Sequence, residues 1–156
     1  MKNLAAASIL VLGALGFSGE AQAKGNLGIG LVGEDPSGLT VKYKMSEKQA
    51  LDFRLGLGFR FDNAFLGQVN YLISPFELAN TGDFSLPFYV GLGGTLFVFN
   101  NGNNDGIALR ARVPIGVALE LNAVPLDIFL EVAPQLGLIP DIDVFIDGAA
   151  GVRFWF

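Results

Sequence analysis

The chain has 156 residues, which is the usual length of a single domain. Hydrophobic residues make up 51% of it and charged residues only 16%, and the mean hydropathy is +0.48. After the N-terminal segment, no run reaches the roughly 18 consecutive apolar residues that a membrane-spanning helix needs, whereas alternating barrel strands give high apolar content without such runs. The composition therefore favours a membrane β-barrel.

Two residue types are absent, and their absence excludes several kinds of chemistry. Without cysteine there are no disulfides, cysteine nucleophiles, thiolate metal sites or lipid-modified cysteines. Without histidine the chain lacks the commonest general base and the commonest transition-metal ligand. The net charge of -5 gives no support for a nucleic-acid-binding surface. We therefore expect no enzymatic activity, no cofactor, no metal and no nucleic-acid partner.

Residues 1–23 are typical of a cleavable secretory signal peptide. Lys2 supplies the positive charge, the stretch from Leu4 to Phe17 supplies the apolar core, and Ala21-Gln22-Ala23 supplies the small-residue cleavage site. We expect cleavage near Ala23 and export of residues 24–156 as one barrel domain.

The exported part divides into eight predicted strands separated by turn residues, with no sustained helical period. Their ranges are 26–33, 39–45, 51–61, 65–73, 86–99, 107–121, 126–133 and 143–156. The third strand shows the strictest alternation, and its apolar face consists of Leu51, Phe53, Leu55, Leu57, Phe59 and Phe61. An even strand number and crossings of about 11 residues are typical of bacterial outer-membrane barrels. The predicted fold is an all-β, eight-stranded antiparallel up-and-down transmembrane β-barrel.

Four places interrupt this pattern. Gly93-Gly94 predicts a β-bulge in the fifth strand, and Pro114 predicts a kink in the sixth because proline lacks a backbone N–H. Residues 74–85 are predicted to form the longest connection, and residues 134–142 the last loop.

The face of the strands opposite the apolar one carries glycines and charges of both signs, which suits the narrow lumen of an eight-stranded barrel. We expect these charges to form a network that satisfies the buried ions and plugs the lumen. The predicted network comprises Asp52, Arg54, Arg60, Arg110, Arg112, Glu120, Glu131, Asp147 and Arg153.

Aromatic residues are predicted to gather at both ends of the outward face. Because an even-numbered barrel has both termini in the periplasm, the strand count assigns each aromatic residue to one end. The expected periplasmic girdle is Tyr43, Tyr71, Phe88, Phe154 and Phe156, and the expected outer girdle is Phe59, Phe61 and Phe65.

The last three residues, Phe154-Trp155-Phe156, resemble the C-terminal assembly signal of bacterial outer-membrane barrels. Together with the signal peptide and the strand count, they make the mature chain similar to the small eight-stranded, porin-like outer-membrane proteins of the OmpA transmembrane-domain and OmpX type. The resemblance implies a location in a Gram-negative-type outer membrane, contact with outer-membrane lipids, and assembly by the barrel-assembly machinery. We expect a monomer. The short outer loops depart from OmpX-type proteins, whose protruding strands serve adhesion, and no ligand site is implied.

Two motif matches are rejected by their context. Residues 28–33 have the glycine spacing of a dinucleotide-binding fingerprint, but Glu34-Asp35-Pro36 follows where a helix N-terminus is needed. Residues 101–106 match the start of a calcium-binding loop, but the closing position is Arg112 instead of glutamate.

Three functional hypotheses follow from the sequence. The first is a non-enzymatic structural or surface-interaction protein of the outer membrane with an ion-plugged lumen. The second is a narrow channel for ions or small solutes, gated by the same charges. The third is a soluble periplasmic, lipocalin-like ligand-binding barrel, which would carry its apolar face inward.

Overall fold

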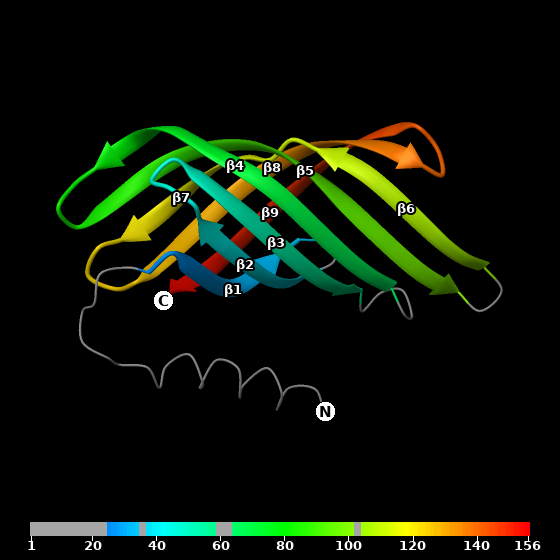
Figure 1. The fold of residues 1–156 in the computed structure, drawn as a ribbon, viewed down its shortest axis with the longest axis horizontal. Helices are drawn as coiled ribbons and strands as arrows, with labels where there is room; N and C mark the ends of the chain where they lie inside the picture. The colour runs from blue at the N-terminus through cyan, green and yellow to red at the C-terminus, as the bar shows by residue number, and fades with distance from the viewer. Residues whose placement is uncertain (1–24, 35–36, 59–63, 102–103) are drawn as a thin grey trace, which may run out of the picture.

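The computed structural model describes residues 25–34, 37–58, 64–101 and 104–156, and these residues form an all-β fold whose strands run obliquely around a ring (Figure 1). The strands are β1 (Leu27–Gly33), β2 (Gly38–Lys44), β3 (Gln49–Gly58), β4 (Ala64–Asn80), β5 (Phe84–Asn101), β6 (Asn104–Arg112), β7 (Ile115–Leu121), β8 (Leu126–Ile139) and β9 (Asp143–Trp155). The described residues contain no helix that is long and apolar enough to cross a membrane.

The ring closes because the first strand pairs with the last. β1 and β9 are antiparallel, with Ile29 opposite Phe154 and Gly30 opposite Arg153. From β1 the antiparallel pairing continues through β2, β3, β4 and β5, then through β6 and β7 to β8 and back to β9. The predicted closed, up-and-down antiparallel barrel is therefore confirmed.

β6 and β7 occupy one position in the ring, so the nine strands fill eight positions. Arg112 lies opposite Gly93 on β5, and Ile115 lies opposite Val90, so the register is the same on both sides of the break. The break falls at Val113 and Pro114, where proline has no N–H to offer the ladder. Gly91 still donates its N–H to the carbonyl of Pro114 at 2.9 Å. The proline thus interrupts the predicted strand 107–121 without changing its register.

The prediction of a long connection at residues 74–85 is wrong. β4 continues to Asn80 and β5 begins at Phe84, so the connection is only residues 81–83. Register shifts between Ile73 and Phe76, and again before Asn80, take the unpaired residues out of the ladder, as β-bulges do. The rings of Phe76 and Phe88 then stack, with centroids 5.0 Å apart.

The predicted last loop, residues 134–142, is also mostly strand. β8 runs to Ile139, and Pro134 lies opposite Ile146 in an uninterrupted ladder with β9. The carbonyl of Pro134 accepts a hydrogen bond from Val113 at 3.0 Å, so this proline faces the break in the neighbouring strand. Two prolines on adjacent strands therefore share one interruption, and the true connection is residues 140–142.

The predicted bulge at Gly93-Gly94 is absent, because both glycines pair in register with Asn70 and Val69 on β4. A side chain at Gly93 would collide with Asn70, so glycine is needed for the close approach of the two strands. The alternation consequently continues through buried Thr95 to Phe97, which faces the interior.

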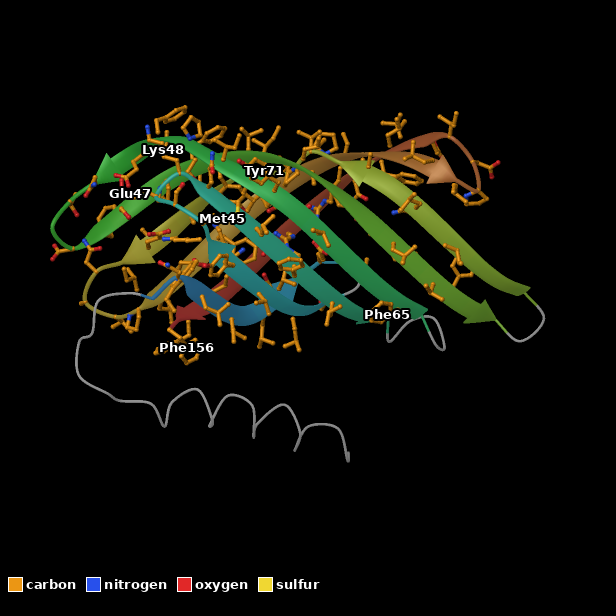
Figure 2. The ribbon with its side chains drawn as sticks, in the orientation of Figure 1. Met45, Glu47, Lys48, Phe65, Tyr71 and Phe156 are labelled. Carbon is orange, nitrogen blue, oxygen red and sulfur yellow. The ribbon has the colours of Figure 1, made fainter. Side chains whose placement is uncertain are left out.

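The barrel wall has two unlike faces. Outward side chains are mostly aliphatic or aromatic, and Phe65 and Tyr71 are examples (Figure 2). Many of them are strongly exposed, such as Leu92 at 65% and Leu130 at 60%. Inward side chains are largely polar, and the largest fully buried ones include Arg54, Arg112 and Arg153, each 1% exposed. The fold therefore places its charges inside and its apolar surface outside.

Candidate functional site

Arg54 on β3 is the centre of the charged interior. Its two terminal nitrogens donate to the two carboxylate oxygens of Glu131, Nη1 to Oε1 at 3.1 Å and Nη2 to Oε2 at 2.7 Å. Its Nε donates to Asp52 at 2.8 Å, and Nη1 also reaches Glu34 at 3.1 Å. Because β3 and β8 stand on opposite sides of the ring, the Arg54–Glu131 pair crosses the lumen.

Glu131 is shared by several donors. Arg112 on β6 donates Nη2 to Oε1 at 2.8 Å, and the hydroxyl of Tyr89 on β5 donates to Oε2 at 2.9 Å. The side chains of Arg54 and Glu131 have no exposed surface, and that of Arg112 has 1%. Such a charge is tolerated in a buried position because every oxygen is engaged by a charged or hydroxyl donor.

Glu34 joins this cluster from the connection between β1 and β2. It accepts from Arg54 and from the amide nitrogen of Gln68 at 2.6 Å, and Arg112 in turn donates to the Gln68 carbonyl oxygen. Burial raises the pKa of Glu34 above its ordinary value, although Arg54 and Arg112 act to lower it. The cluster thus reaches the end of the lumen opposite the chain termini.

A second group of charges lies nearer the end that carries the chain termini. Arg153 on β9 lies between two carboxylates, with Nη1 3.3 Å from Asp127 and Nη2 3.7 Å from Asp52. Asp127 also accepts from the indole N–H of Trp155 at 2.8 Å, and Asp52 accepts from Thr40 at 2.8 Å. Asp52 is the link, because it contacts both Arg54 and Arg153.

Phe129 on β8 supports both groups from inside the wall. The guanidinium carbon of Arg153 lies 3.8 Å from the centre of its ring, and that of Arg54 lies 5.4 Å away. These distances are in the range of cation–π attraction. Gly151 is the cross-strand neighbour of Phe129, and a side chain there would collide with the ring.

The nine predicted lumen charges are placed as follows. The structure joins Asp52, Arg54, Arg112, Glu131 and Arg153 into one set of ion pairs. Glu120 is held separately by Lys44 at 2.9 Å, and Asp147 accepts a hydrogen bond from Gln135. The Arg110 guanidinium lies over two rings, 4.8 Å from the centre of Phe97 and 4.1 Å from that of Phe145. Arg60 lies outside the described residues.

Several members of the interior were missed by the sequence analysis. Tyr89 and Asp127 have the parity of the lumen face, so strand alternation alone would have found them. Glu34 gave no such signal because it belongs to a turn, where alternation does not apply.

The predicted aromatic residues of the outward face are distributed unevenly. Phe65, Tyr71 and Phe156 are exposed (Figure 2). Tyr43 is also exposed, while Phe88 and Phe154 are half-buried. β4 continues well beyond Tyr71, so this ring is not at the end of its strand. Phe59 and Phe61 lie outside the described residues.

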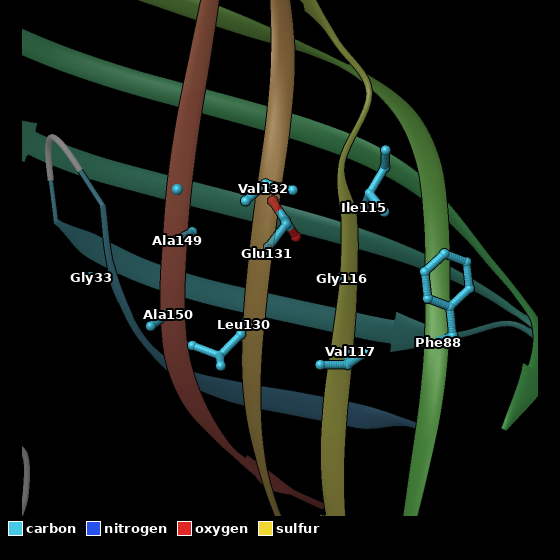
Figure 3. A pocket seen from close by; sticks show the side chains of 11 residues that line it. Gly33, Phe88, Ile115, Gly116, Val117, Leu130, Glu131, Val132, Ala149 and Ala150 are labelled. Atoms are coloured by element: carbon cyan, nitrogen blue, oxygen red, sulfur yellow. The ribbon is translucent and has the colours of Figure 1, made fainter. Parts of the chain in front are cut away.

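The terminal aromatic residues divide between the two faces of β9. Phe154 and Phe156 pack edge to face, with ring centroids 5.1 Å apart, whereas Trp155 is 2% exposed and points inward to Asp127. A shallow apolar hollow of about 600 Å³ lies over β5, β7, β8 and β9, and Ile115, Val117, Leu130 and Ala150 are among the residues that line it (Figure 3).

The fold is similar to that of a solved bacterial barrel. The N-terminal β-barrel domain of Pseudomonas aeruginosa OprF superposes with a TM-score of 0.54 at 15% identity, over 86% of this chain and 100% of that one. No protein-family model matches the sequence. The comparison with curated proteins gives no match either.

Proposed function

We propose that this chain is an integral outer-membrane β-barrel protein, without enzymatic activity, whose lumen is closed by the ion pairs around Arg54 and Glu131. Its role is structural or lies in contacts at the cell surface. The observation that carries the proposal is the bidentate Arg54–Glu131 pair, which joins opposite walls of a barrel whose outside is apolar.

The membrane part of the proposal rests on the reversal of the two faces. A soluble barrel of the lipocalin type holds apolar side chains inside, whereas here Arg54, Arg112 and Arg153 are inside and Leu92 and Leu130 are among the most exposed residues. The β1–β9 pairing leaves the ring closed, as lipid requires, because an open strand edge has no water to bind. The likeness in fold to the OprF barrel domain supports the same placement.

The orientation follows from the ring of eight positions. The start of β1 and the end of β9 lie at the end of the barrel that carries the β4–β5 and β7–β8 connections (Figure 1), and this end would face the periplasm. The partners in this proposal are outer-membrane lipids and, during biogenesis, the barrel-assembly machinery. The protein would act as a monomer after removal of residues 1–23.

The closed lumen rests on the density of the contacts. Glu131 alone holds Arg54, Arg112 and Tyr89, and its side chain has no exposed surface. To pass through the lumen, an ion must break the ion pairs between these buried side chains. Leaving a buried charge without its partner costs several kcal/mol.

A narrow channel is the second candidate, and the polar groups at both ends of the network favour it. Lys44 and Glu120 stand towards one end, and Arg110 stands towards the other. These charged side chains would guide ions towards the middle of the lumen if the ion pairs around Arg54 and Glu131 exchanged partners.

Conductance across planar lipid bilayers separates the two candidates. We expect no reproducible conductance for the wild-type protein and a small steady conductance for Glu131→Ala, which removes the central carboxylate. Glu120→Ala is the matched control, because among the described residues this carboxylate forms an ion pair with Lys44 alone. A steady wild-type conductance that Glu131→Ala abolishes or enlarges would overturn the closed lumen.

The membrane placement has its own test. A folded barrel in the outer-membrane fraction should migrate faster on a detergent gel before boiling than after boiling. Recovery of the protein in the periplasmic soluble fraction without detergent, with no change in migration on boiling, would favour the soluble barrel.

A further inference from the structure

A small polar cavity of about 50 Å³ lies at the end of the lumen nearest the chain termini. Its lining includes Lys42, Lys44, Ser46, Ser74, Tyr89 and Glu120. One water molecule needs about 10–15 Å³ of such space, so the cavity holds a few waters or one small ion and excludes a sugar or a nucleotide.

Lys42 is the unusual member of this lining, because it is 5% exposed and none of the carboxylates that the structure describes forms an ion pair with its ammonium. Its cross-strand neighbour is Asp52, but that carboxylate is bound by Arg54 and Thr40. The Lys42 ammonium lies instead over the ring of Tyr89, 5.1 Å from its centre. Among the residues that the structure describes, none accepts a hydrogen bond from it or forms an ion pair with it.

Asp127 and Asp52 attract the Lys42 ammonium without pairing with it, and Arg153 and Lys44 repel it. Asp127 is bound by Arg153 and Trp155. Glu120 is engaged by Lys44 at 2.9 Å, and Glu77 accepts from Asn80 at 2.6 Å on the exposed rim. Glu47 is exposed on the same rim. A buried cation without a counter-ion is costly, and attraction to one ring offsets only part of that cost.

We propose that this cavity binds one small monovalent anion, a halide or a short carboxylate, with the Lys42 ammonium as its charged partner. The anion supplies a direct ion pair, which none of the described carboxylates gives to Lys42. The volume sets the size of the ligand, and the buried Lys42 ammonium sets its charge. Tyr89 lines this cavity and also donates to Glu131, so the site adjoins the ion pairs that close the lumen.

The test uses the mature protein refolded in detergent micelles. Sodium acetate and sodium chloride are titrated separately, with sodium gluconate holding the ionic strength constant because gluconate is too large for the cavity. We expect saturable NMR chemical-shift changes at the Lys42 ammonium and the Tyr89 ring for at least one of the two anions. Changes that do not saturate, or that gluconate reproduces, would show only a general salt effect and would overturn the proposal.

Two variants locate the site. Lys42→Met keeps the aliphatic stem and should weaken the anion affinity by at least about tenfold, because it removes the charged donor. Lys48→Met removes an exposed lysine of the same rim and should leave binding in place. Loss of binding in Lys48→Met but not in Lys42→Met would refute the assignment to Lys42.

A measurement on the wild-type protein avoids any folding defect of Lys42→Met. An amine-reactive reagent should modify Lys42 several-fold more slowly at saturating acetate than in gluconate, as read by mass spectrometry of the Lys42 peptide. An unchanged rate at Lys42 would contradict the proposal.

Discussion

Glu131 receives both terminal nitrogens of Arg54 from the opposite wall of the barrel, at 2.7 and 3.1 Å, although the two residues are 77 positions apart in the chain. Because Arg112 and Tyr89 donate to the same carboxylate, Glu131 joins three strands besides its own. The stability of the closed barrel therefore depends strongly on one side chain.

Glu131→Gln should lower the free energy of unfolding by about 3–5 kcal/mol, because Arg54 and Arg112 remain buried with their shared counter-charge removed. Denaturant unfolding in lipid vesicles measures this change. Glu120→Gln is the control and should cost about 1 kcal/mol or less, since its partner Lys44 is partly exposed. Equal costs for the two variants would show that Glu131 has no special position.

Gly151→Val should cost about 1–3 kcal/mol by pushing the Phe129 ring away from Arg153 and Arg54. The control is Ala150→Val, one residue earlier on the outward face of β9, and it should change the unfolding free energy by less than about 0.5 kcal/mol. The same unfolding assay compares them. If Ala150→Val were the more harmful change, the facing of β9 would be wrong.

Leu130→Arg tests the lipid-facing wall directly. Leu130 is 60% exposed within the ring, whereas Leu78 is 55% exposed on the β4–β5 hairpin beyond the first register shift. In a membrane, arginine at the bilayer midplane costs about 2–4 kcal/mol, and near the interface about 0–1 kcal/mol. We expect Leu130→Arg to fall in the first range and Leu78→Arg in the second. Similar small costs at both positions would argue against a membrane.

Phe156→Asp should impair assembly, because the terminal aromatic is predicted to act as the assembly signal and also packs on Phe154. The measurement is the amount of heat-modifiable protein in the outer-membrane fraction. Leu126→Asp is the matched control, since Leu126 lies opposite Phe154 on the same rim. Normal levels of Phe156→Asp, or equal losses in both variants, would count against a signal specific to the C-terminus.

Glu34 should make the stability of the barrel depend on pH. Burial raises its pKa in the folded state, so between the unfolded and folded pKa values the folded protein binds more protons than the unfolded one. The contribution of Glu34 to stability therefore falls as the pH rises from its ordinary pKa of 4.5 through the raised value. As the pH rises over this range, the unfolding free energy of the wild-type protein should fall relative to that of Glu34→Gln.

The matched control for that series is Glu47→Gln, which changes an exposed glutamate in another turn. Its difference from the wild-type protein should be flat over the same pH range. A flat difference for Glu34→Gln as well would remove Glu34 as the source of the pH dependence.

Local pattern by itself determined which face of each strand points outward. The alternation of residues 51–56 and 144–156 predicts the exposed and buried positions of β3 and β9, because successive side chains of any strand point to opposite faces. The interruption at Pro114 was also predictable from the sequence, because the missing backbone N–H is a property of that one residue.

Strand lengths were decided only by tertiary structure. Residues 74–80 and 134–139 contain proline and read as loops, yet they extend β4 and β8 because bulges and a neighbouring break accommodate the prolines. Whether a proline ends a strand depends on which neighbour faces it. That neighbour lies far away in the sequence.

The partners of the interior charges were likewise beyond the sequence. Alternation placed Arg54 and Glu131 on the lumen face, but their meeting requires the β1–β9 closure and the register of every strand between them. Glu34 reaches Arg54 from a turn, and the Lys42 ammonium lies over the ring of Tyr89. Both contacts depend on the space that the closed ring leaves inside. The sequence thus determined the two faces, which are a local property, and the closed ring decided the pairs, which are not.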